Sequence, residues 1–136
     1  MEQVILVDSS VLIDLIERTP EWYAWSAEQL FVATQRERVG INVIVFAEIA
    51  RSFENFAAQQ NFLEESKIFF FNIPAAAAYQ ASQAHRAYRA AGGAKIATLP
   101  DFFIGAHAQV EGYTLMTRDA KRMLTYFPQV PVISPR

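Results

Sequence analysis

The sequence predicts an α/β fold in which helices flank a mostly parallel central sheet, so that the domain has three layers, α/β/α. The first observation is that short apolar runs alternate along the chain with longer segments of helical periodicity, which is typical of parallel strands joined by right-handed crossovers. The second is the character of the runs themselves. Val4–Val7, for example, is apolar on both faces and rich in β-branched residues, as expected for a strand covered by helices on both sides.

The first half of the chain is predicted to contain two strands and the helices that follow them. Thr19 and Pro20 suit the N-cap and first position of a long helix, and Gly40 suits its end. The predicted elements are a strand at Val4–Val7, a helix from Ser9, a long helix at Glu21–Arg38, a strand at Ile41–Val45 and a helix from Phe46.

The second half continues the alternation. Its alanine-rich segment is a strong helix former, and Pro131 places the last strand at a sheet edge because proline cannot donate to a strand ladder. The predicted helices are Asn55–Ser66, Ala75–Ala91, Leu99–Glu111 and Ala120–Phe127, and the predicted strands are Ile68–Phe71, which should be short and buried, Tyr113–Thr117 and Val130–Ile133.

The composition fits a single globular domain over residues 1–136, because 52% of the residues are hydrophobic and 19% are charged. Cysteine is absent, which excludes a disulfide framework, a thiolate zinc site and a cysteine nucleophile. No apolar run approaches the roughly 18 residues of a membrane span. Asp8 and Asp14 also interrupt the apolar stretch that a signal peptide would need. We therefore expect a cytoplasmic protein without a membrane partner.

Four acidic residues stand where the chain leaves a predicted strand or enters a predicted helix. They are Asp8, Glu48, Asp101 and Asp119. Because ligands of open α/β sheets bind at the carboxyl ends of the strands, these carboxylates are candidates for one shared site. Each aspartate also has a structural alternative, since Asp8 and Asp119 suit helix N-caps and Asp101 suits the positive end of a helix dipole.

Glu48 is harder to explain by capping. It stands within Phe46–Ala50, whose other members are apolar, and a buried carboxylate is normally paired, protonated or bound to a cation. Mg²⁺ and Mn²⁺ prefer carboxylate oxygens, and four carboxylates at one edge repel one another unless a divalent ion neutralises them. The chemistry that matches this inventory is phosphodiester hydrolysis, in which the metal activates water and offsets charge.

Polar residues near these acids are candidates for supporting roles. Ser10 and Thr117 suit hydrogen bonds to metal-bound carboxylates, although a helix cap and a strand-end hydroxyl are equally good alternatives. With only His85 and His107 in the chain, a histidine-built metal site is not expected. His107 should be a satisfied core residue and His85 a surface residue, and Asp14 should be solvated.

The cations of the chain are distributed unevenly. The formal net charge is −2, but without the four candidate acids ten acidic residues remain against twelve Lys and Arg, a balance of +2. Cations precede Asp101 and flank Asp119, as a phosphate-backbone substrate would require around an acidic centre. The candidate substrate-binding residues are Arg86, Arg89, Arg118 and Lys121, with Lys95 and Arg122 beside them. The alternative is that these cations cover solvated helix faces.

Four segments together resemble a PIN domain, and in particular the VapC-type toxins of toxin–antitoxin pairs. They are VDSSVLIDL, VFAEIAR, LPDFFIGAHA and LMTRDAKRM, and they occur in the family's order over essentially the whole chain. The resemblance implies that Asp8, Glu48, Asp101 and Asp119 are metal ligands and that Thr117 is the family's hydroxyl two residues before the last acid. It also implies an Mg²⁺- or Mn²⁺-dependent endoribonuclease that forms a homodimer and is inhibited by a cognate antitoxin.

Two other classes of protein stay open beside this one. A receiver-like signalling domain also binds Mg²⁺ at a sheet edge, but it needs an adjacent acidic pair after the first strand, and here Asp8 is followed by serines. The second is a binding protein that keeps the PIN fold without catalysis, against which the presence of all four acids argues.

The long second helix is a candidate interface. It carries Trp22, Tyr23, Trp25 and Phe31, more aromatic area than one side of a small helix usually buries internally. Aromatic residues are enriched in interface cores, so we expect a homodimer that also binds an antitoxin near this helix.

Overall fold

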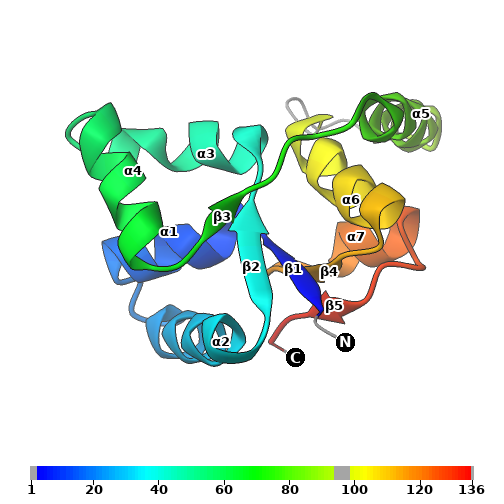
Figure 1. The fold of residues 1–136 in the computed structure, drawn as a ribbon. Coiled ribbons are helices and arrows are strands. Elements are labelled where there is room, and N and C mark those ends of the chain that lie inside the picture. Colours follow the sequence, from blue (N-terminus) through cyan, green and yellow to red (C-terminus); the bar gives the residue numbers. More distant parts are fainter. Residues whose placement is uncertain (1–2, 94–98, 136) are drawn as a thin grey trace.

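The sheet contains five strands, all parallel, in the order β3-β2-β1-β4-β5 (Figure 1). The computed structural model describes residues 3–93 and 99–135. β1 lies in the middle and pairs with β2 on one side and β4 on the other. The predicted parallel sheet is thereby confirmed. The strands are β1 (Val4–Val7), β2 (Arg38–Ile41), β3 (Phe69–Phe70), β4 (Thr114–Met116) and β5 (Val132–Ile133).

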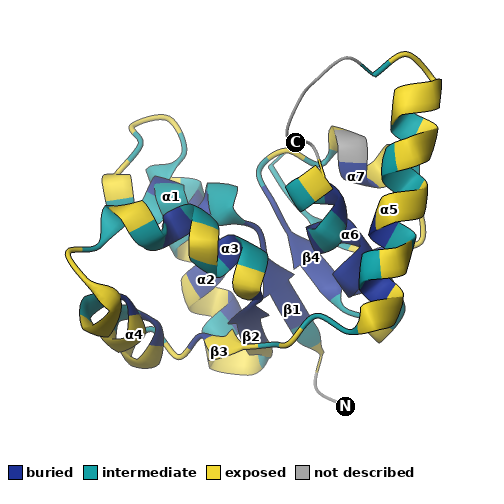
Figure 2. Ribbon diagram, turned by 90° about the horizontal axis from the view of Figure 1, so that it is seen from above, coloured by how far each residue is buried: buried dark blue, intermediate teal, exposed yellow. Residues whose placement is uncertain are grey.

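The helices of the described residues fall into two groups. Helices α1 to α4 lie on one side of β1 and β4, and α5 to α7 lie on the other, as Figures 1 and 2 both show. This arrangement confirms the three-layer α/β/α fold. Among the helices of the described residues, none combines the length and the hydropathy that a membrane-spanning segment requires. The helices are α1 (Ser9–Glu17), α2 (Tyr23–Arg36), α3 (Val43–Ile49), η1 (a 3-10 turn at Ala50–Ser52), α4 (Phe56–Glu65), α5 (Ala75–Ala90), α6 (Leu99–Glu111) and α7 (Lys121–Tyr126).

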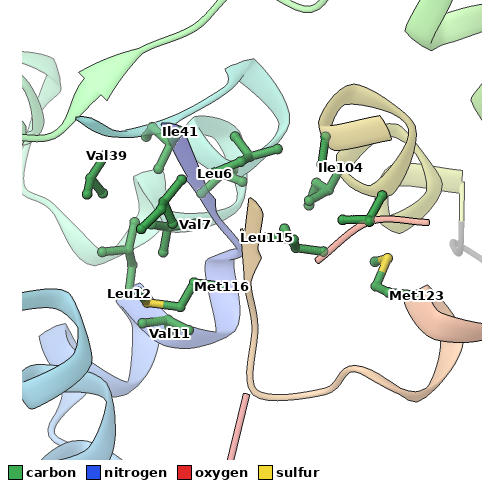
Figure 3. Close-up of a cluster of buried hydrophobic side chains, with 14 of the residues drawn as sticks. Leu6, Val7, Val11, Leu12, Val39, Ile41, Ile104, Leu115, Met116 and Met123 are labelled. Carbon is green, nitrogen blue, oxygen red and sulfur yellow. The ribbon is translucent and has the colours of Figure 1, made fainter. Parts of the chain in front are cut away.

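The hydrophobic core runs along both faces of the two central strands. Leu6 and Val7 of β1 and Leu115 and Met116 of β4 are fully buried, and Figure 3 shows these side chains with Ile104 and Leu12 around them. This two-sided burial explains why the central strands read as continuous apolar runs rather than alternating ones. It also fixes the ends of β1 and β4, which Asp8 and Thr117 directly follow.

The boundary between α2 and β2 differs from the prediction. α2 ends at Arg36, and β2 begins at Arg38, so the last residue of the predicted helix Glu21–Arg38 is already strand. Gly40 does not end a helix but lies within β2, where the ring of Phe71 occupies the space that a side chain would need. The glycine therefore serves a close approach between neighbouring strands, which its sequence position alone did not reveal.

The predicted strand Ile41–Val45 is wrong beyond Ile41. Asn42 ends the extended segment because its side-chain Oδ1 accepts hydrogen bonds from the backbone N–H groups of Ile44 and Val45, at 3.0 and 3.1 Å. This is the geometry of an N-cap. Helix α3 consequently begins at Val43, and its apolar residues, which read as strand, are helical.

Two further expectations about burial are wrong. β3 is not a buried strand, because Phe69 and Phe70 are each about half exposed, at 49% and 48%, on the outermost strand of the sheet. Asp14 is not solvated but fully buried, because its charge is paired within the fold, as described below. The remaining predicted helices and strands are present with ends shifted by a few residues.

Candidate active site

The carboxyl end of β1 lies beside that of β4, because the two strands pair in parallel with Val7 opposite Met116. Asp8 follows β1 directly, and its backbone N–H donates to the Met116 carbonyl oxygen at 2.8 Å. Thr117 and Asp119 follow β4. Two of the four candidate acids therefore start from neighbouring strand ends.

The carboxylate of Asp8 is held by three hydrogen bonds. Its Oδ1 accepts from the backbone N–H of Ser9 at 2.8 Å and so caps α1. Its Oδ2 accepts from the hydroxyls of Ser10 and Thr117 at 2.9 and 2.7 Å. Burial raises the pKa of Asp8, the three hydrogen bonds oppose this rise, and the nearby charge of Asp119 adds to it. Asp8 is thus both the helix cap that the sequence suggested and a member of the acidic group.

The two hydroxyls join Asp8 to the loop that follows β4. Thr117 Oγ1 donates to Asp8 and accepts from the backbone N–H of Asp119 at 3.1 Å. Ser10 Oγ donates to Asp8 and accepts from the backbone N–H of Arg118 at 3.2 Å. Each hydroxyl is used as both donor and acceptor, so the position of Asp119 is tied to that of Asp8.

Three of the four acids line one pocket of about 330 Å³. Asp8 and Asp119 reach it from the strand ends, and Asp101 reaches it from the first turn of α6, where it was expected. Asp119 is exposed and does not occupy the cap position of α7, which belongs to Ala120. The other lining residues are Ser9, Ser10, Ile13, Arg118 and Met123.

Glu48 reaches the same group by a different route from the one predicted. It lies near the end of α3 rather than just after a strand. Burial raises the pKa of Glu48, and the charges of Asp8 and Asp101 raise it further, while hydrogen bonding to the Ser9 side chain opposes the rise. Its carboxylate therefore lies within electrostatic reach of the pocket acids. Its Oε1 atom is buried and has no hydrogen-bond partner among the described residues.

These residues fit a divalent cation by their chemistry. Hard cations such as Mg²⁺ and Mn²⁺ take carboxylate oxygens and retain several waters. A buried carboxylate oxygen without a partner is costly unless a cation or proton joins it, and Glu48 Oε1 is in that position. Among the described side chains, however, no three His, Cys, Asp or Glu residues already stand close enough to form a ready metal cluster.

Arg118, a candidate substrate-binding residue, makes a two-point ion pair with Asp14. Its Nε and Nη2 atoms lie 2.7 and 3.0 Å from Asp14 Oδ2 and Oδ1. The hydroxyl of Ser26 also donates to Asp14, at 3.2 Å, and the guanidinium lies 5.5 Å from the ring centre of Trp22. This pair attaches the loop after β4 to α1, and the Arg118 side chain remains 31% exposed at the pocket.

The other candidate substrate-binding cations lie on helices at the surface. Arg86 and Arg89 are exposed on α5, and Lys121 is exposed at the start of α7. Lys95 and the side chain of Arg122 lie outside the described part of the structure. Of the described cations, Arg118 is thus the member of this group that lines the acidic pocket.

Sequence reasoning missed Asn42 as the N-cap of α3, the helix that carries Glu48. It is fully buried, and its side-chain Nδ2 lies 3.0 Å from Nδ1 of His107. The signal that would have identified Asn42 is its residue type between a short extended run and a helix, which is typical of an N-cap. His107 is buried as expected, but its Nε2 has no hydrogen-bond partner among the described residues. His85 is half-buried, with its ring against those of Tyr88 and Phe102.

The fold and the pocket define an α/β domain with an acidic site at the carboxyl edge of a parallel sheet. The chain belongs to the PIN domain family, whose model matches residues 5–127. The strand order 3-2-1-4-5 also differs from the 2-1-3-4-5 order of receiver-like domains, which excludes the signalling alternative. Among curated proteins, none matches this sequence significantly.

Several solved structures share the fold. The VapBC2 complex of Rickettsia felis bound to promoter DNA has a chain with a TM-score of 0.72 and 17% identity, over 98% of this chain and 100% of that one. A chain of DNA-bound VapBC from Salmonella typhimurium has a TM-score of 0.67 and 20% sequence identity, over 98% of each chain. A chain of a toxin–antitoxin complex from Klebsiella pneumoniae has a TM-score of 0.65 and 24% sequence identity, over 97% of this chain and 98% of that one. At these identities the similarity establishes the fold.

Proposed function

We propose that this protein is a metal-dependent endoribonuclease and the toxin of a VapBC-type toxin–antitoxin pair. The observation that carries the proposal is the gathering of Asp8, Asp101 and Asp119 at one pocket, with Glu48 in electrostatic reach. Membership of the PIN domain family and the fold shared with chains of toxin–antitoxin complexes support it.

In this proposal Asp8, Glu48, Asp101 and Asp119 hold Mg²⁺ or Mn²⁺. When bound, such an ion activates water and offsets the charge that develops in the in-line displacement at phosphorus. The chain's own contribution is to keep the carboxylates in place. Ser10 and Thr117 orient Asp8 and fix the Asp119 backbone through the hydrogen bonds described above, so the site needs little reorganisation when it is used.

The proposed substrate is RNA, bound through its phosphates by Arg86, Arg89, Arg118 and Lys121. Arg86, Arg89 and Lys121 are exposed, which leaves them available to a solvated phosphate backbone. Arg118 is already paired with Asp14, so its contribution to RNA binding should be smaller than that of Lys121. Because the proposed substrate is RNA, we place the activity in the cytoplasm.

The proposed antitoxin site is the apolar surface between α2 and α4. A hollow of about 260 Å³ there is lined by Leu30 and Phe31 of α2 and by Glu65 of α4, and Phe31 is 65% exposed. A second hollow of about 720 Å³ continues past Leu63 to the edge strand β3. An apolar segment of an antitoxin would bury this surface. The proposed homodimer has separate apolar surface available at Val43 and Phe56, which are 51% and 66% exposed.

The decisive experiment is incubation of purified, antitoxin-free protein with total RNA in Mg²⁺, in Mn²⁺ and in EDTA. We expect discrete cleavage products with either metal and none in EDTA, and loss of cleavage in Asp101→Asn. If the folded parent leaves RNA intact in both metals, the catalytic proposal is wrong, and a PIN-fold binding protein without catalysis takes its place.

A further inference from the structure

A buried hydrogen bond joins the segment that carries Glu48 to the helix that carries Asp101. Asn42 Nδ2 and His107 Nδ1 lie 3.0 Å apart, and both residues are fully buried. Asn42 stands directly before α3, six residues ahead of Glu48, and His107 lies in α6, six residues after Asp101. The two helices that supply these acids, one from each of the two helix groups (Figure 1), are therefore linked by this pair of side chains.

The direction of this hydrogen bond follows from the cap of α3. Asn42 Oδ1 already accepts from the backbone N–H groups of Ile44 and Val45, so Nδ2 faces the histidine and donates. His107 Nδ1 must then be the acceptor, which places the ring proton on Nε2. The neutral ring agrees with its surroundings, because burial lowers the pKa of His107.

The position of Glu48 depends on this cap. α3 has only seven residues and follows β2 with Asn42 alone between them, so Asn42 is its point of attachment to the sheet. At about 1.5 Å per residue, Glu48 lies roughly 9 Å along the helix axis from Asn42. A small tilt at Asn42 therefore displaces the Glu48 carboxylate, whose Oε1 has no hydrogen-bond partner among the described residues.

We propose that His107 is a positioning residue, which acts through Asn42 to hold α3 against α6 and so sets where the Glu48 carboxylate lies relative to Asp101. The side-chain amide of Asn42 both caps α3 and donates to His107, so a movement of one hydrogen-bonded group displaces the other. The consequence for metal binding and cleavage rests on the proposed function. The positioning itself does not.

Three variants separate the hydrogen bond from packing. His107→Asn keeps an acceptor where Nδ1 stands but removes the rest of the ring. His107→Phe keeps the ring and its contact with Tyr113, whose ring centre is 5.5 Å away, but has no acceptor. Asn42→Ser keeps a capping oxygen, but its side chain is too short to reach His107. This variant tests the same hydrogen bond if His107→Phe does not fold.

The absence of cysteine makes a direct distance measurement simple. Spin labels at Ala47→Cys on α3 and Glu111→Cys on α6, both exposed positions, report the separation of the helices by pulsed electron paramagnetic resonance. We expect one narrow distance in the parent and in His107→Asn, and a broadened or shifted distribution in His107→Phe and Asn42→Ser. Two variants of α4 control for general destabilisation, Leu63→Ala in the core and Asn55→Ser at its cap, and both should keep the parental distance.

Calorimetric titration with Mn²⁺ then tests the consequence at the site. His107→Phe and Asn42→Ser should bind Mn²⁺ about tenfold more weakly, as for other residues that orient ligands from outside the coordination sphere, while His107→Asn and the two α4 controls stay within about twofold. A parental distance distribution in both His107→Phe and Asn42→Ser overturns the positioning role. If the parent neither binds Mn²⁺ nor cleaves RNA, the proposed function fails, and the spin-label distances still decide the role of His107.

Discussion

Asp8 and Glu48 face the same group of acids, but the protein holds them in different ways. Asp8 accepts three hydrogen bonds, and the loop beside it is attached to α1 through the Asp14–Arg118 ion pair. Glu48 leaves Oε1 buried without a partner among the described residues. Burial raises the pKa of both carboxylates, yet only on the Asp8 side do several hydrogen bonds oppose that rise.

The difference suggests a division of labour between a fixed side and an adaptable side of the pocket. On the Asp8 side, carboxylate, hydroxyls and loop are arranged before any ligand arrives, which reduces the cost of reorganisation. On the Glu48 side, an oxygen without a partner costs stability that a cation can recover. Binding of the ion should therefore stabilise the protein mainly through Glu48.

The largest expected effect comes from disrupting the fixed side at Arg118. Arg118→Met leaves Asp14 fully buried, and among the described residues the Ser26 hydroxyl is then the side-chain donor that remains to it. Breaking a buried pair from one side costs about 3–5 kcal/mol, and we expect a loss of that size in the free energy of unfolding from urea titration. The exposed residue Arg51 gives the matched control, Arg51→Met. A loss below about 1 kcal/mol would put this pair with ordinary surface ion pairs.

The next effect tests whether the pocket acids hold the metal. Asp101→Asn keeps the size of the side chain but removes the charge that binds the cation, so RNA cleavage should fall at least about 100-fold. Single-turnover cleavage at saturating Mn²⁺ measures this, and circular dichroism checks that the fold is intact. Glu54→Gln, at an exposed glutamate, should cleave at the parental rate. Parental cleavage by Asp101→Asn would remove Asp101 from the metal site.

A smaller effect is expected on stability when Glu48, on the adaptable side of the pocket, is replaced. Because the pKa of Glu48 is raised above 4.5 in the fold, the folded state favours the protonated carboxyl. The loss of folding stability caused by ionising Glu48 therefore develops as pH rises through 4.5, and it persists at pH 7. In EDTA at pH 7, Glu48→Gln should melt no lower than the parent, and any advantage should vanish well below pH 4.5. Glu54→Gln is again the control.

Bound metal should make the parent more stable than Glu48→Gln, the reverse of the order expected in EDTA. Mn²⁺ at ten times its dissociation constant should stabilise the parent by about 1.4 kcal/mol through mass action, and should stabilise Glu48→Gln much less. Equal stabilisation of the two proteins would show that Glu48 does not contact the ion, and the proposed division between the two sides would be wrong.

The smallest effect concerns the surface cations. Lys121→Ala should weaken RNA binding and flatten its salt dependence by about 0.7 log units of affinity per log unit of salt, the value for one phosphate contact on a single strand. The cleavage rate at saturating RNA should stay near the parental rate. Arg86→Ala and Arg89→Ala on α5 extend the test, and unchanged binding in all three variants would make these cations merely solvated surface.

The fold was predictable because its strands are buried on both faces and its helices have clear periodicity. Asp8 and Thr117 were predictable for the same reason, since an apolar run that ends in a polar residue marks a strand end. Glu48 was singled out because it is a carboxylate in an apolar segment, but that segment was assigned to the end of a strand, whereas Glu48 lies in α3. The role of Gly40 depends on the distant side chain of Phe71, which the local pattern does not show, whereas the capping role of Asn42 was a local signal that was overlooked.

The burial of Asp14 was not predictable from local sequence. Its partner, Arg118, is 104 positions away, and nothing near Asp14 in the chain indicates the ion pair. The strand order was hidden for the same reason, since β1 pairs with β4 across most of the chain. Long-range pairing of this kind leaves no periodic signal, so sequence patterns supplied the elements of the site but not the contacts that hold them.

The hydrogen bond between Thr117 and Asp8 spans 109 positions, and this separation has a consequence during synthesis. Ribosomes add about 5–20 residues per second, so roughly 5 to 20 s pass between the addition of Asp8 and that of Thr117. Throughout that interval β1 lacks its neighbour β4, and the pocket lacks Asp101 for most of it and Asp119 for all of it. A nascent chain therefore cannot possess the complete acidic site, and the ribosome that makes this protein is not exposed to its proposed activity until nearly the whole domain has been translated.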